Sequence, residues 1–304
     1  MVRGYVPLLL IVAGIWGASY LFIKVAVREI EPTAMMDLRL ILAAAVLVPL
    51  LTLRLGARGA VAQVQSTGWG AFILGVSNMA FPFVLIAWGE KHIDSGVAAI
   101  ANATVPLFVA LLAIRFNPSE RVRGLRLVGV LLGLVGVGVL TGLHPEGGWW
   151  GVAGTLAVVV ASLSYASANL YTQQRFPRTS PLVITTASVL AASLVLLPFA
   201  LLQLPDHMPS WKALASVAAL GIAGTALALL FFYAMLNRYG ASRASLVTYL
   251  LPPFALVYGF IFLNENMTLN ALLGLGLILA GVALGSGFLQ MARRRAAAPA
   301  TPRP

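Results

Sequence analysis

Ten long apolar segments divide this chain of 304 residues. A helix needs about 20 mostly apolar residues to cross the hydrocarbon core of a bilayer, and each segment is close to that length. Hydrophobic residues make up 60% of the chain and charged residues only 10%, whereas a soluble domain carries about 25% charged residues. The composition therefore predicts a membrane protein. The predicted spans are about 6–26, 33–53, 69–89, 96–116, 124–142, 151–173, 181–203, 211–236, 244–263 and 269–289.

Helices are expected in these segments rather than strands. The segments are continuous, rich in Ala, Leu and Gly, and lack the alternation of a membrane barrel. Backbone polar groups in lipid must bond within their own segment, so we expect an all-α integral membrane protein with ten transmembrane helices. Glycine pairs such as Gly129 with Gly133 and Gly274 with Gly281 suit close helix packing. The chain has no cysteine, which excludes disulfides and thiolate chemistry.

The second half of the chain reads as a weak copy of the first. Matched residues keep their order at offsets of 145 to 149, and an ordered series with small drift indicates a duplication. Each copy holds five predicted spans, and because five is odd the copies must cross a membrane in opposite directions. Inverted repeats of this kind recur in secondary transporters. The matched pairs include Pro32 with Pro181, Pro106 with Pro252, Glu120 with Glu265, and Gly136 with Gly281.

The placement of charge predicts the orientation. With the N-terminus inside, fifteen of the twenty Lys and Arg residues fall on inner loops and ends and four on the outer side, while eight of the nine acidic residues lie toward the outer side. The positive-inside rule then puts both termini in the cytoplasm. This pattern, rather than nucleic-acid binding, accounts for the net charge of +11. We expect a first five-helix repeat at 1–144, a second at 145–291, and a disordered basic cytoplasmic tail at 292–304.

Polar residues inside the spans are candidates for a binding site, because they are costly in lipid. Trp16, Tyr20 and Lys24 recur at i, i+4 and i+8 and therefore share one helix face. Adding the repeat offset of 149 gives a matching face with Tyr165 and Asn169. Two matched faces could line a pathway between the halves, or they could form only interhelical hydrogen bonds. Lys24 lies near a helix end and could also snorkel to the interface.

The fourth and ninth predicted spans each contain polar residues before a proline. Asn102 precedes Pro106, and Thr248 with Tyr249 precedes Pro252. A proline inside a helix frees a backbone carbonyl, which the neighbouring polar side chains could serve or which could meet a ligand at the kink. The third span adds Asn78 on one face, with Phe81 beside it, and Ser19 flanks the face of the first span.

Arg39 is the most costly residue in the predicted spans, at about 2.5–3.5 kcal/mol for a central position on insertion scales. Asp37 and Glu90 are acidic candidates for an ion pair with it. A ligand carboxylate is the other interpretation. The candidate substrate-binding residues are Trp16, Ser19, Tyr20, Lys24, Arg39, Asn78, Phe81, Asn102, Tyr165, Asn169, Thr248 and Tyr249.

The sequence offers no catalytic, metal or cofactor site. Its histidines, His92, His144 and His207, all fall in predicted loops, and the spans contain no pair of aspartates. The phosphate-binding loop of an ATP-driven pump is also missing. These features argue against an intramembrane enzyme and against a primary pump. No carboxylate lies at mid-span, so transport without proton coupling, as a uniporter or an exchanger, is an open interpretation.

Residues 6–289 resemble the EamA-like branch of the drug/metabolite transporter superfamily. The resemblance rests on short motifs in the same order in both copies: Trp16-Gly17-Ala18-Ser19, Pro32, Pro106 with Glu120 and Leu127-x-Gly129-x6-Gly136, then Tyr165-Ala166, Pro181, Ala241-Ser242-x2-Ser245, Pro252-x12-Glu265 and Leu272-x-Gly274-x6-Gly281. It implies two inverted five-helix repeats, a central cavity, alternating access, and gradient-driven movement of small metabolites, often amino acids. The family glutamates map to Glu120 and Glu265, which we interpret as structural or gating residues.

The expectation is therefore a multi-pass secondary transporter of the bacterial inner membrane. Its partners would be a small-molecule substrate, such as an amphipathic amino acid or a related compound, and membrane lipids, without nucleic acid or cofactor. It would act as a monomer or homodimer. A non-transporting scaffold or lipid-binding subunit and a lipid flippase are the alternatives. Substrate identity and direction do not follow from the sequence.

Overall fold

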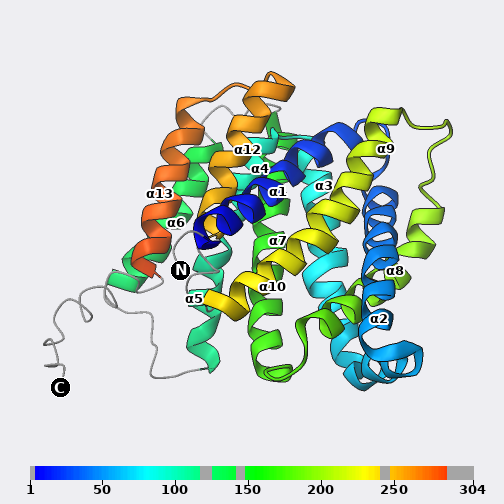
Figure 1. The fold of residues 1–304 in the computed structure, drawn as a ribbon. Helices are drawn as coiled ribbons and strands as arrows, with labels where there is room; N and C mark the ends of the chain where they lie inside the picture. The colour runs from blue at the N-terminus through cyan, green and yellow to red at the C-terminus, as the bar shows by residue number, and fades with distance from the viewer. Residues whose placement is uncertain (1–3, 117–124, 142–147, 240–246, 286–304) are drawn as a thin grey trace, which may run out of the picture.

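A computed structural model describes residues 4–116, 125–141, 148–239 and 247–285, and every element in these ranges is helical (Figure 1). The first half contains α1 (Tyr5–Ala26), α2 (Pro32–Gly75), η2 (Val76–Ala80), α3 (Phe81–Glu90), α4 (Ser95–Asn102), α5 (Val105–Phe116) and α6 (Leu125–Thr141). The second half contains α7 (Gly148–Arg175), α8 (Pro181–Leu201), α9 (Trp211–Ala218), η4 (Ala219–Leu227), α10 (Ala228–Tyr239), α12 (Val247–Leu263) and α13 (Leu269–Gly285).

Five helices in the described ranges are long and apolar enough to cross a membrane. One of them runs from Pro32 to Glu90 and changes direction at Gly56 and Gly68, whose φ angles of 70° and 52° interrupt the regular helix. Glycine adopts such angles without the steric cost that a side chain would bring. The described part of the chain is all-helical, and its apolar helices are those expected of a membrane protein. The others of this length are Tyr5–Ala26, Gly148–Arg175, Pro181–Leu201 and Trp211–Phe232, and four shorter apolar helices accompany them.

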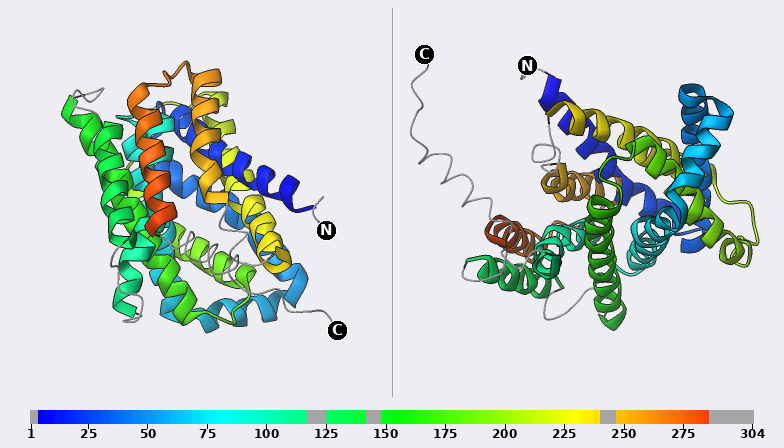
Figure 2. Two further views of the ribbon diagram at one scale, coloured as in Figure 1. Left: turned by 90° about the vertical axis from the view of Figure 1, so that its left-hand side faces the viewer. Right: turned by 90° about the horizontal axis from the view of Figure 1, so that it is seen from below.

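The two halves of the chain pack mainly against each other. Helix α2 lies along α8, and α6 runs beside α13 in every view (Figures 1 and 2). Helix α1 packs against α12, and in the same way α7 packs against α4 and α5. Helix α3 packs against α7, and α1 packs against α9, η4 and α10. The main contacts between the halves therefore have counterparts in which the halves exchange roles.

Glycines bring α6 and α13 into backbone contact. A Cβ atom added at Gly281 would lie 2.6 Å from the carbonyl oxygen of Gly129 and 2.6 Å from the amide nitrogen of Gly133. One added at Gly274 would lie 3.0 Å from the carbonyl oxygen of Gly136. In lipid, helices associate by this close van der Waals packing rather than by a hydrophobic driving force. The prediction that these glycines serve helix packing is confirmed.

Two π-helical segments, η2 and η4, interrupt the third and eighth predicted spans. At the repeat offset of 145, residues 76–80 of η2 correspond to 221–225 within η4. The π-helix is rare and is frequently found at functional sites, because its extra residue per turn leaves backbone groups without regular partners. The corresponding placement of both segments directs attention to the helices that contact them.

Candidate functional site

Three helices meet at a short chain of hydrogen bonds inside the protein. Ser162 Oγ on α7 lies within hydrogen-bond distance of Asn102 Oδ1, at 3.1 Å, and of the Val158 carbonyl oxygen in its own helix, at 3.0 Å. Asn102 Nδ2 donates to the hydroxyl oxygen of Tyr20 on α1 at 2.9 Å. Tyr20 and Ser162 are buried. Asn102 can reach both because it ends α4, where the chain breaks before α5. Together with Arg39 and Thr225, whose contacts are given in the next paragraph, Tyr20, Asn102 and Ser162 form a group that we call the central polar cluster.

Arg39 is buried, with 6% of its surface exposed. Its Nε donates to Thr225 Oγ1 on η4 at 2.9 Å, and its guanidinium carbon lies 4.0 Å from the ring centroid of Phe83. Its Nη1 lies 3.9 Å from the sulfur of Met36. The Thr225 hydroxyl in turn donates to the carbonyl of Leu220 at 3.0 Å. Tyr20 and Tyr165 are within electrostatic range of the guanidinium.

The predicted ion pair of Arg39 with Asp37 or Glu90 is wrong. All three side chains are described, and Arg39 pairs with neither carboxylate. Asp37 instead accepts a hydrogen bond from Ser193 on α8 at 2.6 Å, because residues two positions apart on a helix face different neighbours. Glu90 lies seven positions beyond Phe83 on α3, about 10 Å along the helix axis. Among the described residues, the guanidinium is therefore left without a carboxylate partner.

The two π-helical segments accept matching hydrogen bonds. Trp16 Nε1 on α1 donates to the carbonyl oxygen of Gly224 in η4 at 3.0 Å. Ser164 Oγ on α7 donates to the carbonyl oxygen of Ser77 in η2 at 2.7 Å. The donors are 148 positions apart and the acceptors 147, close to the repeat offsets, so the two bonds have similar places in the two halves although Trp16 itself aligns with Tyr165. The faces identified on the first and sixth spans thus contact the interrupted helices of the opposite halves.

Other predicted residues on the first helix make mainly structural contacts. Lys24 is half-buried, and its Nζ donates to the carbonyl oxygens of Glu90 and Ile93, both at 2.7 Å. Ser19 donates to the carbonyl of Ile15 one turn earlier, at 3.3 Å.

The remaining predicted residues differ in burial. Tyr165 and Tyr249 are half-buried against the main core. Asn78 in η2 and Thr248 on α12 are also half-buried, whereas Phe81 and Asn169 are exposed. The structure therefore brings Tyr20, Arg39 and Asn102 together with Tyr165 nearby, and leaves Phe81 and Asn169 outside that cluster.

Several residues of the site were not identified from the sequence. Ser162, Thr225 and Phe83 contact the predicted residues, and a polar residue in mid-span is the signal that could have revealed the first two. Glu265, predicted to be structural or gating, has a defined role: its carboxylate accepts from the Ser95 amide at 2.9 Å, the Ser95 hydroxyl at 2.7 Å and the Gly96 amide at 3.3 Å. A carboxylate at a helix N-terminus satisfies amides that have no partner within the helix. Its repeat counterpart, Glu120, lies outside the described residues.

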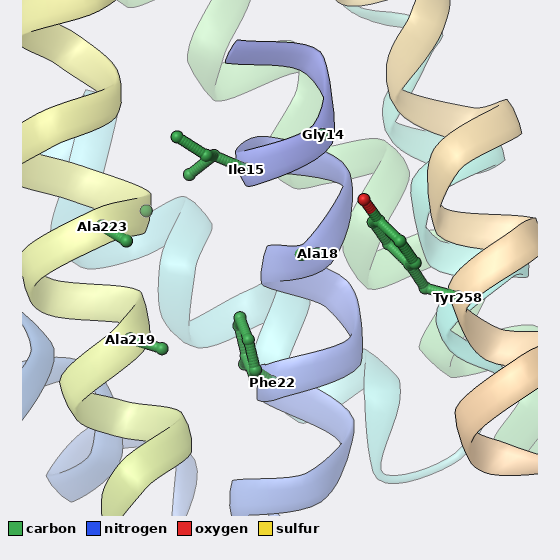
Figure 3. A pocket seen from close by; sticks show the side chains of 8 residues that line it. Gly14, Ile15, Ala18, Phe22, Ala219, Ala223 and Tyr258 are labelled. Carbon is green, nitrogen blue, oxygen red and sulfur yellow. The ribbon is translucent and has the colours of Figure 1, made fainter. Parts of the chain in front are cut away.

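An apolar pocket of about 250 Å³ lies between α1, η4 and α12 (Figure 3). It adjoins the central polar cluster at Gly224, which directly precedes Thr225 in η4 and whose carbonyl accepts from Trp16. The Tyr258 hydroxyl is the one polar side-chain group in its lining. The lining residues are Gly14, Ile15, Ala18, Phe22, Ala219, Ala223, Gly224 and Tyr258.

A bundle of apolar helices with polar side chains buried between its halves is the construction of a membrane transport protein. The chain belongs to the EamA-like transporter family, whose profile matches it twice, over residues 4–142 and 152–287. This confirms the family expected from the sequence motifs.

Relatives along nearly the full length of the chain are also transporters by name. A probable amino-acid metabolite efflux pump of Salmonella typhimurium is 26% identical over 92% of this chain and 93% of its own length. The uncharacterized inner membrane transporter YedA of Escherichia coli is 26% identical over 89% and 86%, and an uncharacterized transporter of Archaeoglobus fulgidus is 29% identical over 88% and 93%. A solved crystal structure with 20% identity matches the fold with a TM-score of 0.65, covering 96% of this chain and 98% of that one.

Proposed function

We propose that this protein is a secondary transporter that moves a small organic metabolite across a bacterial inner membrane by alternating access. The observation that carries the proposal is the matched pair of hydrogen bonds from Trp16 to Gly224 and from Ser164 to Ser77. They join α1 and α7 to interrupted helices of the opposite halves. Rocking one half against the other could exchange two such equivalent contacts without breaking either helix.

Ten spans in two inverted repeats are part of this proposal. The helix from Pro32 to Glu90 supplies two spans, one before and one after the bends at Gly56 and Gly68. The other long and short apolar helices supply the remaining spans. The exchanged contacts between the halves support the repeats, and the excess of arginine on alternate loops supports cytoplasmic termini. The name of the E. coli relative supports the inner membrane.

The surroundings of Arg39 indicate the substrate class. Within the part of the chain that the structure describes, its guanidinium has one oxygen partner, Thr225, and no carboxylate. An arginine has further N–H donors in a fork that fits a carboxylate. The rings of Phe83, Tyr20 and Tyr165 suit a partly apolar remainder. An amphipathic amino acid or a related carboxylate matches these groups, in keeping with the name of the Salmonella relative.

A thermal-shift screen of the purified full chain against amino acids and related carboxylates tests this proposal. A ligand present at about 100 times its Kd stabilises the state that binds it by about 2.7 kcal/mol, so a true substrate raises the melting temperature measurably. Compounds that do so are then tested for uptake into proteoliposomes. A broad panel without any hit or any uptake would favour the scaffold alternative.

Substitution of Arg39 is the first specific prediction. We expect Arg39→Gln to weaken binding of the carboxylate by roughly 10-fold or more, because a charged hydrogen bond contributes about 1.5–3 kcal/mol. Arg39→Lys, which keeps the charge but loses the fork, should retain part of the affinity. Equal affinity of both variants and the wild type, measured by ligand-induced thermal shift, would remove Arg39 from the site.

The apolar pocket beside α1 favours one second candidate, a lipid-moving protein. Its lining offers a single polar side-chain group, the Tyr258 hydroxyl, and would accept part of an acyl chain rather than a zwitterion. Translocation of a fluorescent phospholipid between vesicle leaflets, with Ala223→Leu to fill the pocket, distinguishes the two candidates. Loss of lipid translocation with metabolite uptake unchanged would assign the pocket to lipid.

A further inference from the structure

Glu90, the last residue of α3, has an unusual environment. Its side chain is fully buried, with 0% exposure, and neither carboxylate oxygen has a hydrogen-bond partner among the residues that the structure describes. Protein atoms, not lipid, enclose this end of α3: a Cβ added at the adjacent Gly89 would lie 2.9 Å from the Gly154 carbonyl oxygen and 2.9 Å from Val158 on α7. An ionised carboxylate buried without partners is strongly unfavourable. In this conformation the group is best accommodated as a neutral acid.

The charged groups around Glu90 come from two elements. On α1, Lys24 acts on it electrostatically and favours the ionised form, but its ammonium bonds the backbone oxygens of Glu90 and Ile93 and forms no ion pair with the carboxylate. From the loop between α12 and α13, the negative charge of Glu265 acts in the opposite sense. On α7, Gly154 and Val158, the residues that pack against the adjacent Gly89, carry no charge. Lys24 is thus near enough to stabilise an ionised Glu90 after a small rearrangement.

Glu90 is also connected to the central polar cluster. Tyr20, one turn before Lys24 on α1, is within electrostatic range of both Glu90 and Arg39. Its hydroxyl accepts from Asn102, whose Oδ1 lies 3.1 Å from Ser162 Oγ. A change of charge at Glu90 would therefore be felt at the groups that surround the proposed substrate.

We propose that Glu90 is the proton-binding site that couples this transporter to a proton gradient. The inference rests on the proposed transport function. In the conformation described, the carboxyl group holds the proton. When the halves rearrange, its O–H bond breaks, the proton passes to water on the newly opened side, and the carboxylate that remains is stabilised by Lys24. Movement of substrate is then tied to movement of one proton.

Infrared spectroscopy of the purified full chain tests the protonation directly and needs no substrate. At neutral pH we expect a C=O stretching band of a protonated carboxylic acid that shifts in D₂O and is lost in Glu90→Gln. Glu31→Gln is the matched control, because Glu31 is exposed and paired with Lys91 at 2.8 Å. If Glu90→Gln fails to fold, Glu90→Asp takes its place, and it should change the frequency of the C=O stretching band. A band absent from the wild type, or unchanged in both Glu90 variants, overturns the proposal.

Transport assays separate coupling from transport itself. Proteoliposomes are loaded with the amino acid that gives the largest thermal shift, and its radiolabelled form reports exchange and accumulation. We expect Glu90→Gln to keep exchange between equal concentrations near the wild-type rate and to lose accumulation driven by a pH gradient. Gradient-driven accumulation at the wild-type level in this variant would overturn the coupling while leaving the transport function intact. If the wild type shows no transport at all, the proposed function fails, and the infrared result still decides whether Glu90 holds a proton.

Discussion

Arg39 and Asp37 lie two positions apart on α2, yet each finds a different partner. Asp37 faces Ser193 on α8, and Arg39 faces Thr225 and Phe83. Their charges, so close in sequence, do not neutralise each other because the helix turns their side chains apart. A buried cation is costly when no described carboxylate pairs with it. Arg39 is such a cation in a chain with few charges, and this is why we propose that it binds a ligand.

Glu29, in the loop between α1 and α2, gives a pH prediction outside the membrane. Its carboxylate accepts from the side chain and the backbone amide of Ser210, both at 2.6 Å, and these bonds lower its pKa below the usual 4.5. A lowered pKa in the folded state means that the stabilisation is present above the unfolded value and is lost as pH falls through the folded value. We expect wild type to melt slightly above Glu29→Gln at neutral pH, with the difference vanishing in acid below pH 4.5. A gap that widened in acid would contradict the sign.

Ser164 provides a third residue-scale test. Ser164→Ala removes the donor to the Ser77 carbonyl in η2, and we expect a loss of about 1–3 kcal/mol in unfolding free energy for a buried acceptor left unpaired. Ser167→Ala is the control, because Ser167 is exposed and bonds only the carbonyl of Leu163 in its own helix. Detergent-solubilised protein unfolded by heat or denaturant gives both values. Equal stability of the two variants would show that the η2 contact contributes little.

At the scale of elements, the seam between α6 and α13 is a tightly constrained contact between two backbones. Gly281→Ala would place a methyl group against the backbone of Gly129 and Gly133, which cannot move aside as a side chain can. We expect a loss of about 1–3 kcal/mol or more, as for overpacking in a core. Gly276→Ala on the same helix meets nothing within 4 Å and should be neutral or stabilising by up to about 1 kcal/mol. Comparable melting temperatures for both variants would mean that α13 can move away from α6 at little cost in stability.

The π-helical segments were not predicted from the sequence. The sequence of η2 (VSNMA) and that of η4 (ALGIAGTAL) share no residue pattern that sets them apart from the regular helices, so composition gives no signal for the extra residue per turn. The interruption becomes visible only when Trp16 and Ser164 are seen to supply donors to carbonyls in it. The donor residues, Trp16 and Ser164, could be seen in the sequence. Which carbonyl oxygens accept from them could be seen only in the folded structure.

At the scale of the molecule, features that extend over whole segments, such as hydrophobic length and recurring small residues, could be predicted from the sequence. Individual contacts between side chains could not. Hydrophobic length located the helices, and small residues at Gly129, Gly133 and Gly281 located a helix seam. The burial of Glu90 could not be foreseen, because it depends on α1, α7 and a distant loop rather than on its own segment. The exposure of Asn169 was missed for the same reason: a shared helix face does not tell whether another helix covers it. The binding roles of the predicted residues stay predictions.

The exchanged contacts between the halves have a consequence for biogenesis. Helices α2 and α6 find their main partners in α8 and α13, roughly 150 residues later in the chain. At a synthesis rate of about 5–20 residues per second, the early helices wait on the order of ten to thirty seconds in the bilayer before those partners emerge. During that interval lipid, or an insertion chaperone, must cover surfaces that glycine has made flat. Assembly of this protein therefore requires the first half to stay competent for packing until the second half has been inserted.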